Sequence, residues 1–122
     1  MIIANNVSKK FGNLIALNNF SVTCNKGECI ALIGPNGSGK TTFIKAILGM
    51  VVCDSGFITV NGFNIKNDWQ YRSKIGYMPQ IGRYPENMTI GQVLEMMQDI
   101  RGQKNNKDLD EDLIERFAIK SL

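Results

Sequence analysis

At residues 34–41 the sequence is Gly34-Pro35-Asn36-Gly37-Ser38-Gly39-Lys40-Thr41. This segment fits the pattern G-x-x-x-x-G-K-[ST], in which a glycine-rich loop joins a strand to a helix. Its flanks agree, because 29–33 are apolar enough for a buried strand and 42–48 fit a helix. Only a glycine-rich loop can bring a concave ring of backbone N–H groups close to an anion. The segment therefore predicts a phosphate-binding loop.

Individual residues of this loop have separate predicted roles. Lys40 would reach the outer phosphates of a triphosphate as a point charge, and the Thr41 hydroxyl would complete the coordination of Mg²⁺. Thr42 can offer a further N–H and a hydroxyl. The start of the following helix adds its dipole and its free N–H groups. The alternative is a flexible glycine loop with a solvated lysine, which would make the matching flanks a coincidence.

Length and composition indicate one modest soluble domain. The chain has 122 residues, of which 43% are hydrophobic and 20% charged. Its net charge of +3 is small and its lysines are scattered, so we expect no nucleic-acid partner. No apolar run approaches the roughly 18 residues that span a bilayer, and the N-terminus lacks the plan of a signal peptide. The sequence predicts a cytosolic protein.

Cysteine and histidine usage narrows the possible chemistry. The three cysteines, Cys24, Cys29 and Cys53, lack metal-ligand spacing, and we expect them to be reduced and buried rather than paired or metal-bound. The chain has no histidine. Ser-His, Cys-His and His-metal chemistry is therefore excluded within these residues.

The strand pattern indicates two kinds of sheet. Short strands are expected at 2–7, 14–17 and 20–24, and at 57–60 and 63–65 on either side of the hairpin turn Asn61-Gly62, with Asp54-Ser55-Gly56 as a preceding turn. Closely spaced strands of this kind are antiparallel, whereas the strand at 29–33 and its helix, with Gly49 as C-cap, indicate a parallel α/β core. Both sheet types are expected in one chain.

The second half of the chain carries helix signals. Asn67 or Asp68 could cap a short helix, and 75–78 resemble a strand that ends at Pro79. Thr89 and Gln92 form a capping box ahead of a helix with an apolar face, which Arg101-Gly102 would end. A second apolar stripe at helical spacing follows within 108–120.

Several of these segments together resemble the N-terminal part of the nucleotide-binding domain of ATP-binding cassette (ABC) transporters. The matching segments are Lys10-Phe11-Gly12, Ala16-Leu17-Asn18-Asn19-Phe20-Ser21, 34–42, 55–62 and Ile75-Gly76-Tyr77-Met78-Pro79-Gln80. The resemblance covers nearly the whole chain. It implies an α/β fold, a P-loop NTPase core of the ABC ATPase type. Its expected parts are antiparallel β strands in 1–27 and 56–66, a P-loop core in 28–50, a Q-loop strand in 74–80 and the start of a helical subdomain in 88–122.

The resemblance also implies roles for single residues and a set of ligands. Phe11 resembles the aromatic residue that stacks on adenine, and Ala16 lies in the matching segment beside the nucleotide; the alternative for Phe11 is a core residue beside a turn. Gln80 resembles the Q-loop glutamine, which contacts Mg²⁺ and the attacking water; the alternative is a polar strand cap. Lys40 and Gln80 would then be catalytic, Thr41 and Gln80 would be metal ligands, and ATP and Mg²⁺ would be the cofactors.

The same resemblance implies partners and a reaction. The full protein would be an ATPase that dimerises with a second nucleotide-binding domain and drives a transmembrane permease at the cytoplasmic face of the membrane. The loop at 81–88 matches the region that docks onto the permease; a solvated loop is the alternative. The family's signature Leu-Ser-Gly-Gly-Gln, Walker B strand and switch histidine are missing from the sequence. We therefore expect a truncated domain that binds ATP weakly or not at all, hydrolyses it negligibly and self-associates.

Two other functions fit parts of the pattern. One is a soluble ABC-type nucleotide-binding protein without a transport role. The other is a P-loop kinase, which is disfavoured because a β hairpin stands where a kinase would have its acceptor site and lid. The transported substrate and the direction of transport are not encoded in these residues.

Overall fold

The computed structural model describes residues 1–80, 82, 85, 87–100 and 102. The chain forms two compact units, Met1–Gly76 and Tyr77–Leu122. The helix expected within 108–120 lies outside the described residues.

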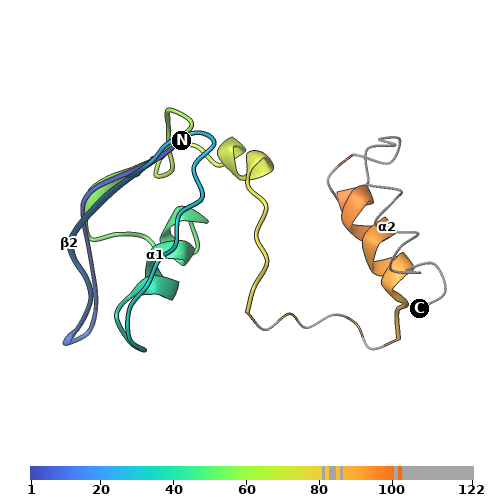
Figure 1. The fold of residues 1–122 in the computed structure, drawn as a ribbon, viewed down its shortest axis with the longest axis horizontal. Helices are drawn as coiled ribbons and strands as arrows, with labels where there is room; N and C mark the ends of the chain where they lie inside the picture. Colours follow the sequence, from blue (N-terminus) through green and yellow to red (C-terminus); the bar gives the residue numbers. More distant parts are fainter. Residues whose placement is uncertain (81, 83–84, 86, 101, 103–122) are drawn as a thin grey trace. The chain divides into compact units, whose positions relative to one another are not determined.

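The first unit is built on a four-stranded antiparallel sheet (Figure 1). Its strands are β1 (Ile2–Phe11), β2 (Leu14–Cys24), β3 (Ser55–Val60) and β4 (Phe63–Asn64), in the order β2-β1-β3-β4. The strands expected at 14–17 and 20–24 are thus one continuous strand. The predicted hairpin is confirmed, because Asn61 (φ 50°) and Gly62 (φ 86°) adopt the two positive φ angles of a type I′ turn between β3 and β4.

Bulges interrupt the pairing of β1 with its neighbours. Asn6 (φ 48°) and Asn19 (φ 47°) adopt the left-handed conformation at these bulges. Their backbone N–H groups donate to serine hydroxyls instead of to the neighbouring strand: Asn6 N–H to Ser21 Oγ (2.8 Å) and Asn19 N–H to Ser8 Oγ (3.0 Å). Gly56 (φ 76°) belongs to β3 and not to a turn as expected. A Cβ there would collide with the carbonyl oxygens of β1, so only glycine fits.

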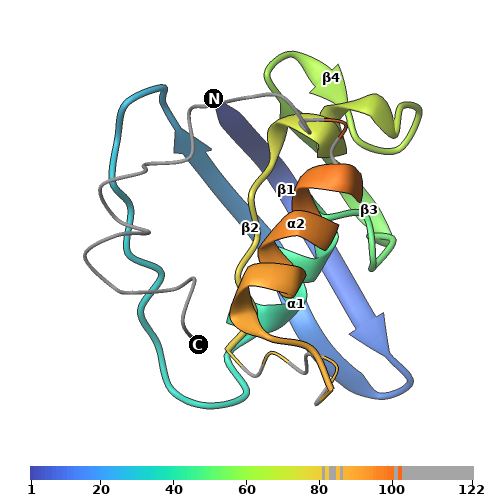
Figure 2. The same ribbon diagram turned by 90° about the vertical axis from the view of Figure 1, so that its right-hand side faces the viewer.

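Helix α1 (Lys40–Ile47) packs on this sheet and completes the core (Figure 2). The rings of Phe43 and Phe20 meet edge to face with their centroids 4.7 Å apart. The helix ends at Ile47 with Leu48 as its C-cap, one residue before the predicted cap Gly49 (φ 69°). The N–H groups of residues 49 and 50 donate to carbonyls of the last turn. The buried residues of the core are Ala4, Val7, Leu17, Phe43, Ala46 and Ile58.

The strand expected at 29–33 is not a strand in the structure. A β-strand needs a neighbouring strand to which its backbone can hydrogen-bond. Within the described residues all four strands belong to the antiparallel sheet, and none of them pairs with 29–33. The segment is instead extended and exposed, with 90% of Ile33 accessible. Cys29 is exposed as well, whereas Cys24 and Cys53 are half-buried, so the expectation of three buried thiols was wrong for Cys29.

The first unit ends in a single 3-10 turn, η1 (Gln70–Lys74). The N-cap of η1 is Trp69, so the prediction of Asn67 or Asp68 as the cap was wrong by one or two residues. The Asp68 carboxylate still accepts the N–H of Gln70 at 2.7 Å, in the turn that precedes η1. Arg72 reaches back and donates to the carbonyl of Gly49 at 3.3 Å. The predicted strand at 75–78 crosses the boundary between the two units and is irregular, again with no strand beside it in the described part of the chain.

The second unit contains helix α2 (Ile90–Ile100). The predicted capping box is confirmed: Thr89 N–H donates to Gln92 Oε1 at 2.9 Å, and Gln92 N–H donates to Thr89 Oγ1 at 3.3 Å. Gly102 (φ 66°) follows the helix in the left-handed conformation. Among the described residues, no helix is both long and apolar enough to cross a membrane.

Candidate functional site

The glycine loop lies between the extended segment 28–33 and α1, next to the β1–β2 hairpin. Gly39 (φ 87°) is the N-cap of α1 and approaches the carbonyl oxygen of Ala16 so closely that a Cβ would collide with it. Gly37 (φ 82°) is also left-handed but has open space around it. Gly39 is therefore needed both for its positive φ and for its close approach to Ala16, whereas Gly37 is needed only for its positive φ.

The Lys40 side chain folds back over the loop that precedes it. Its ammonium donates to the carbonyl oxygens of Gly34 and Pro35, both at 2.7 Å, and lies 3.4 Å from Ser38 Oγ. These contacts place the ammonium over the loop. A positive charge is thus held against the glycine loop.

Backbone donors lie beside this charge. Within the part of the chain that the structure describes, one of the backbone N–H groups of 37–42 has a hydrogen-bond acceptor. It is the N–H of Ser38, which donates to the carbonyl of Pro35 at 3.3 Å. The others belong to the loop and the first turn of α1, where N–H groups have no partner inside the helix. The side chain of Thr41 is exposed next to them. Free donors, a helix N-terminus and an ammonium together favour an anion with several oxygens.

Two further residues of the predicted nucleotide site, Ala16 and Phe11, belong to the same unit. Ala16 touches the loop through its carbonyl oxygen beside Gly39. Phe11 ends β1, pairs with Leu14 across the hairpin, and keeps 48% of its surface accessible. Its ring is therefore not the core residue that the alternative interpretation required.

Gln80 lies in the second unit, in an exposed bend rather than at the end of a strand. The structure thus places Lys40, Thr41, Ala16 and Phe11 in one unit and Gln80 in the other. Within the predicted permease-docking segment, residues 81, 83–84 and 86 lie outside the described residues.

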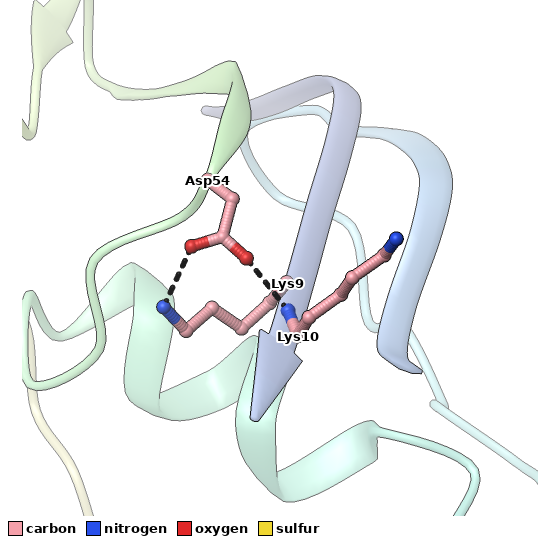
Figure 3. A network of polar contacts seen from close by, with 3 residues as sticks. All are labelled: Lys9, Lys10 and Asp54. Atoms are coloured by element: carbon pink, nitrogen blue, oxygen red, sulfur yellow. Dashed lines mark hydrogen bonds and ion pairs between the residues drawn. The ribbon is translucent and has the colours of Figure 1, made fainter. Parts of the chain in front are cut away.

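The sequence prediction missed a polar cluster at the end of β1. The Asp54 carboxylate accepts the Lys9 ammonium at 2.8 Å and the Lys10 N–H at 2.7 Å, and the two lysine side chains leave β1 on opposite sides (Figure 3). These two hydrogen bonds, the Lys9 contact first, hold the pKa of the Asp54 carboxyl below its usual value. Side chains two residues apart on a strand lie on the same face, so the sequence could have predicted that Lys9 lies on the same side of β1 as Phe11.

Comparison with known proteins agrees with these features. The profile of the family described as ABC transporter matches residues 17–122. The Zinc import ATP-binding protein ZnuC of Rickettsia conorii is 39% identical over 85% of this chain and 42% of its own length. The Nod factor export ATP-binding protein I of Burkholderia lata is 37% identical over 70% of this chain and 28% of its own length. The chain therefore spans less than half the length of these relatives.

A solved structure shows the same fold. The ATP binding subunit of an ABC transporter superposes with a TM-score of 0.81 and 24% identity over 99% of this chain and 52% of that one. The α/β fold of the P-loop NTPase type, with its antiparallel sheet, is thus confirmed. With the family profile covering most of its residues, the chain belongs to the ABC transporter family.

Proposed function

We propose that this chain is the nucleotide-binding part of an ABC transporter ATPase subunit and that residues 34–42 bind the triphosphate of ATP. The observation that supports this most directly is the Lys40 ammonium, held at 2.7 Å by two carbonyls of the loop beside donors that have no described acceptor. A concave set of N–H groups with one fixed cation is complementary to a polyphosphate.

Each residue of the site has a part in this proposal. The N–H groups of 37–42 and the Lys40 ammonium would bind the phosphates, with Gly34, Pro35, Asn36 and Ser38 shaping the loop. Thr41 and Gln80 would be ligands of Mg²⁺, which neutralises phosphate charge when bound. Lys40 and Gln80 would act in catalysis, Phe11 would stack on the adenine, and Ala16 would contact the nucleotide. The exposure of Thr41 and Phe11 leaves both side chains accessible for these contacts.

The full activity involves more than these residues. We propose that the protein hydrolyses ATP as a dimer of two nucleotide-binding domains, at the cytoplasmic face of the membrane, and that it docks onto a permease near 81–88. The chain alone should hydrolyse ATP negligibly. Phosphoryl transfer depends on positioning, and the sequence contains neither the family's signature segment nor its Walker B strand. The exposed apolar residues of 30–33 should also promote self-association.

Binding of inorganic tripolyphosphate and of ATP to the 122-residue chain tests the proposal. NMR titration into the millimolar range detects weak complexes. Lys40→Ala should weaken the binding of both ligands about tenfold or more, because it removes a charge-assisted contact. Lys45→Ala, on the exposed side of the same helix, is the matched control and should change little. Equal effects of the two substitutions would contradict a site at the loop.

Phosphate release tests the absence of turnover. The purified chain should release no phosphate from ATP above the level of the Lys40→Ala variant. Sustained turnover that Lys40→Ala abolishes would show that these residues alone complete a catalytic site.

A further inference from the structure

Asp54 joins the segment after α1 to the end of β1 through three hydrogen bonds. Its carboxylate accepts the Lys9 ammonium and the Lys10 N–H, at 2.8 and 2.7 Å, and its own N–H donates to the carbonyl of Ser8 at 2.9 Å (Figure 3). The backbone bonds fix where the carboxylate stands relative to β1. The carboxylate in turn fixes the Lys9 side chain, of which only 16% is accessible.

The Lys9 ammonium also lies over the Phe11 ring, 5.3 Å from the ring centroid. This distance is within the range of a cation–π contact. The ammonium is thus held between a carboxylate and an aromatic face. Phe11 keeps 48% of its surface accessible, so part of the residue is open to a ligand while Lys9 lies against the ring.

We propose that Asp54 is a positioning residue for base recognition: it holds the Lys9 ammonium against one face of Phe11, so that the opposite face is presented to a purine base. This inference rests on the proposed function, in which Phe11 contacts the adenine of a nucleotide. It adds Asp54 and Lys9 to the site, although neither would touch the nucleotide.

Two physical effects support this role. The faces of aromatic rings are both negative, so direct stacking of two rings is electrostatically unfavourable. A cation behind one ring offsets part of that repulsion. Lysine also has many rotamers, and a lysine without the carboxylate would visit this position for only part of the time. With 48% of the Asp54 side chain accessible, water screens the ion pair and it should add little stability, so its effect should appear in ligand binding rather than in folding.

Comparing ATP with inorganic tripolyphosphate separates the base from the phosphates. Asp54→Asn keeps an acceptor for the Lys10 N–H but removes the charge that holds Lys9. We expect it, and Lys9→Met, to weaken ATP binding about two- to fivefold and to leave tripolyphosphate binding unchanged. Phe11→Ala should weaken ATP binding more, about five- to a hundredfold, because it removes the stacking surface itself.

A double-mutant cycle checks that Asp54 acts through the ring. In the Phe11→Ala background, Asp54→Asn should have no further effect on ATP binding. The ring current of Phe11 gives a second readout that needs no nucleotide. It should shift the Lys9 Hε signals in the wild-type chain, and the shift should disappear in both Asp54→Asn and Phe11→Leu.

The possible results are distinguishable. If Asp54→Asn weakens ATP and tripolyphosphate equally, or still acts without the Phe11 ring, the inference is wrong while the phosphate site stands. If the wild-type chain binds neither ligand at millimolar concentration, the proposed function fails and this inference fails with it. If both ligands bind wild type equally well, the base makes no contribution and Asp54 has no base to position.

Discussion

Helices α1 and α2 have comparable local signals and different surroundings. Both carry apolar residues along one side, and α2 has the better start, a complete capping box, whereas Gly39 offers α1 no side-chain cap. Yet α1 buries Phe43 and Ala46 under the sheet, and α2 buries none of its residues within the described structure. Ile100 in α2 is 77% accessible.

This difference separates two sources of helix stability. A cap and an apolar stripe are local and are sufficient to place the start of α2 at Ile90. Burial requires a partner surface, which the sheet provides for α1. Most helical stability in proteins comes from such packing. Perturbations in the first unit should therefore be larger than matched ones in the second.

The largest difference should appear when an apolar side chain is removed from each helix. Phe43 is 5% accessible and packs on Phe20, so Phe43→Ala should cost about 3–5 kcal/mol in the free energy of unfolding. Ile100→Ala should change stability by no more than about 0.5 kcal/mol. Urea unfolding followed by NMR measures both. Similar costs would show that α2 is as well packed as α1.

Next in size is the contact that anchors the start of α1. Gly39→Ala would combine a left-handed φ with a collision against the Ala16 carbonyl and should cost about 1–3 kcal/mol. Gly37→Ala is the control, because its φ is also positive but nothing lies within 4 Å of a Cβ there. The same unfolding measurement should find Gly37→Ala clearly milder. Equal costs would mean that the close approach to β2 contributes nothing.

In the second unit, the cap should be the feature that matters most. Thr89→Ala removes the hydroxyl that accepts Gln92 N–H and should destabilise α2 by about 1 kcal/mol. Amide hydrogen exchange should speed up in the first turn of α2 and stay unchanged in β1. Faster exchange in both units would indicate that they are thermodynamically coupled.

The smallest effect should come from acid. The hydrogen bonds to Lys9 and Lys10 lower the pKa of Asp54, so its contribution is fully present above the ordinary carboxyl value of about 4 and is lost as the pH falls through its lower folded-state pKa. An NMR titration of the Asp54 carboxyl measures this midpoint. We expect this midpoint to lie below the ordinary carboxyl value of about 4. A midpoint at or above the ordinary value would contradict the contacts in Figure 3.

Features encoded by adjacent residues were predictable. Asn61-Gly62 specifies its turn because these two residues tolerate positive φ, and Thr89 with Gln92 specifies a helix start three residues apart. The loop from Gly34 to Thr41 is encoded in the same way. The segment 29–33 was mispredicted for the opposite reason, since its apolar residues favour a strand but a strand requires a neighbour.

The sequence alone therefore determined the glycine loop, the caps and the hairpin turn, because each depends on the conformational preferences of residues close together in the chain. Only the tertiary structure decided that Asp54 holds Lys9 from 45 residues away, that Gly39 meets Ala16, and that α1 buries Phe43 and Ala46. These contacts depend on how separate elements pack, and no short pattern of residues records that packing.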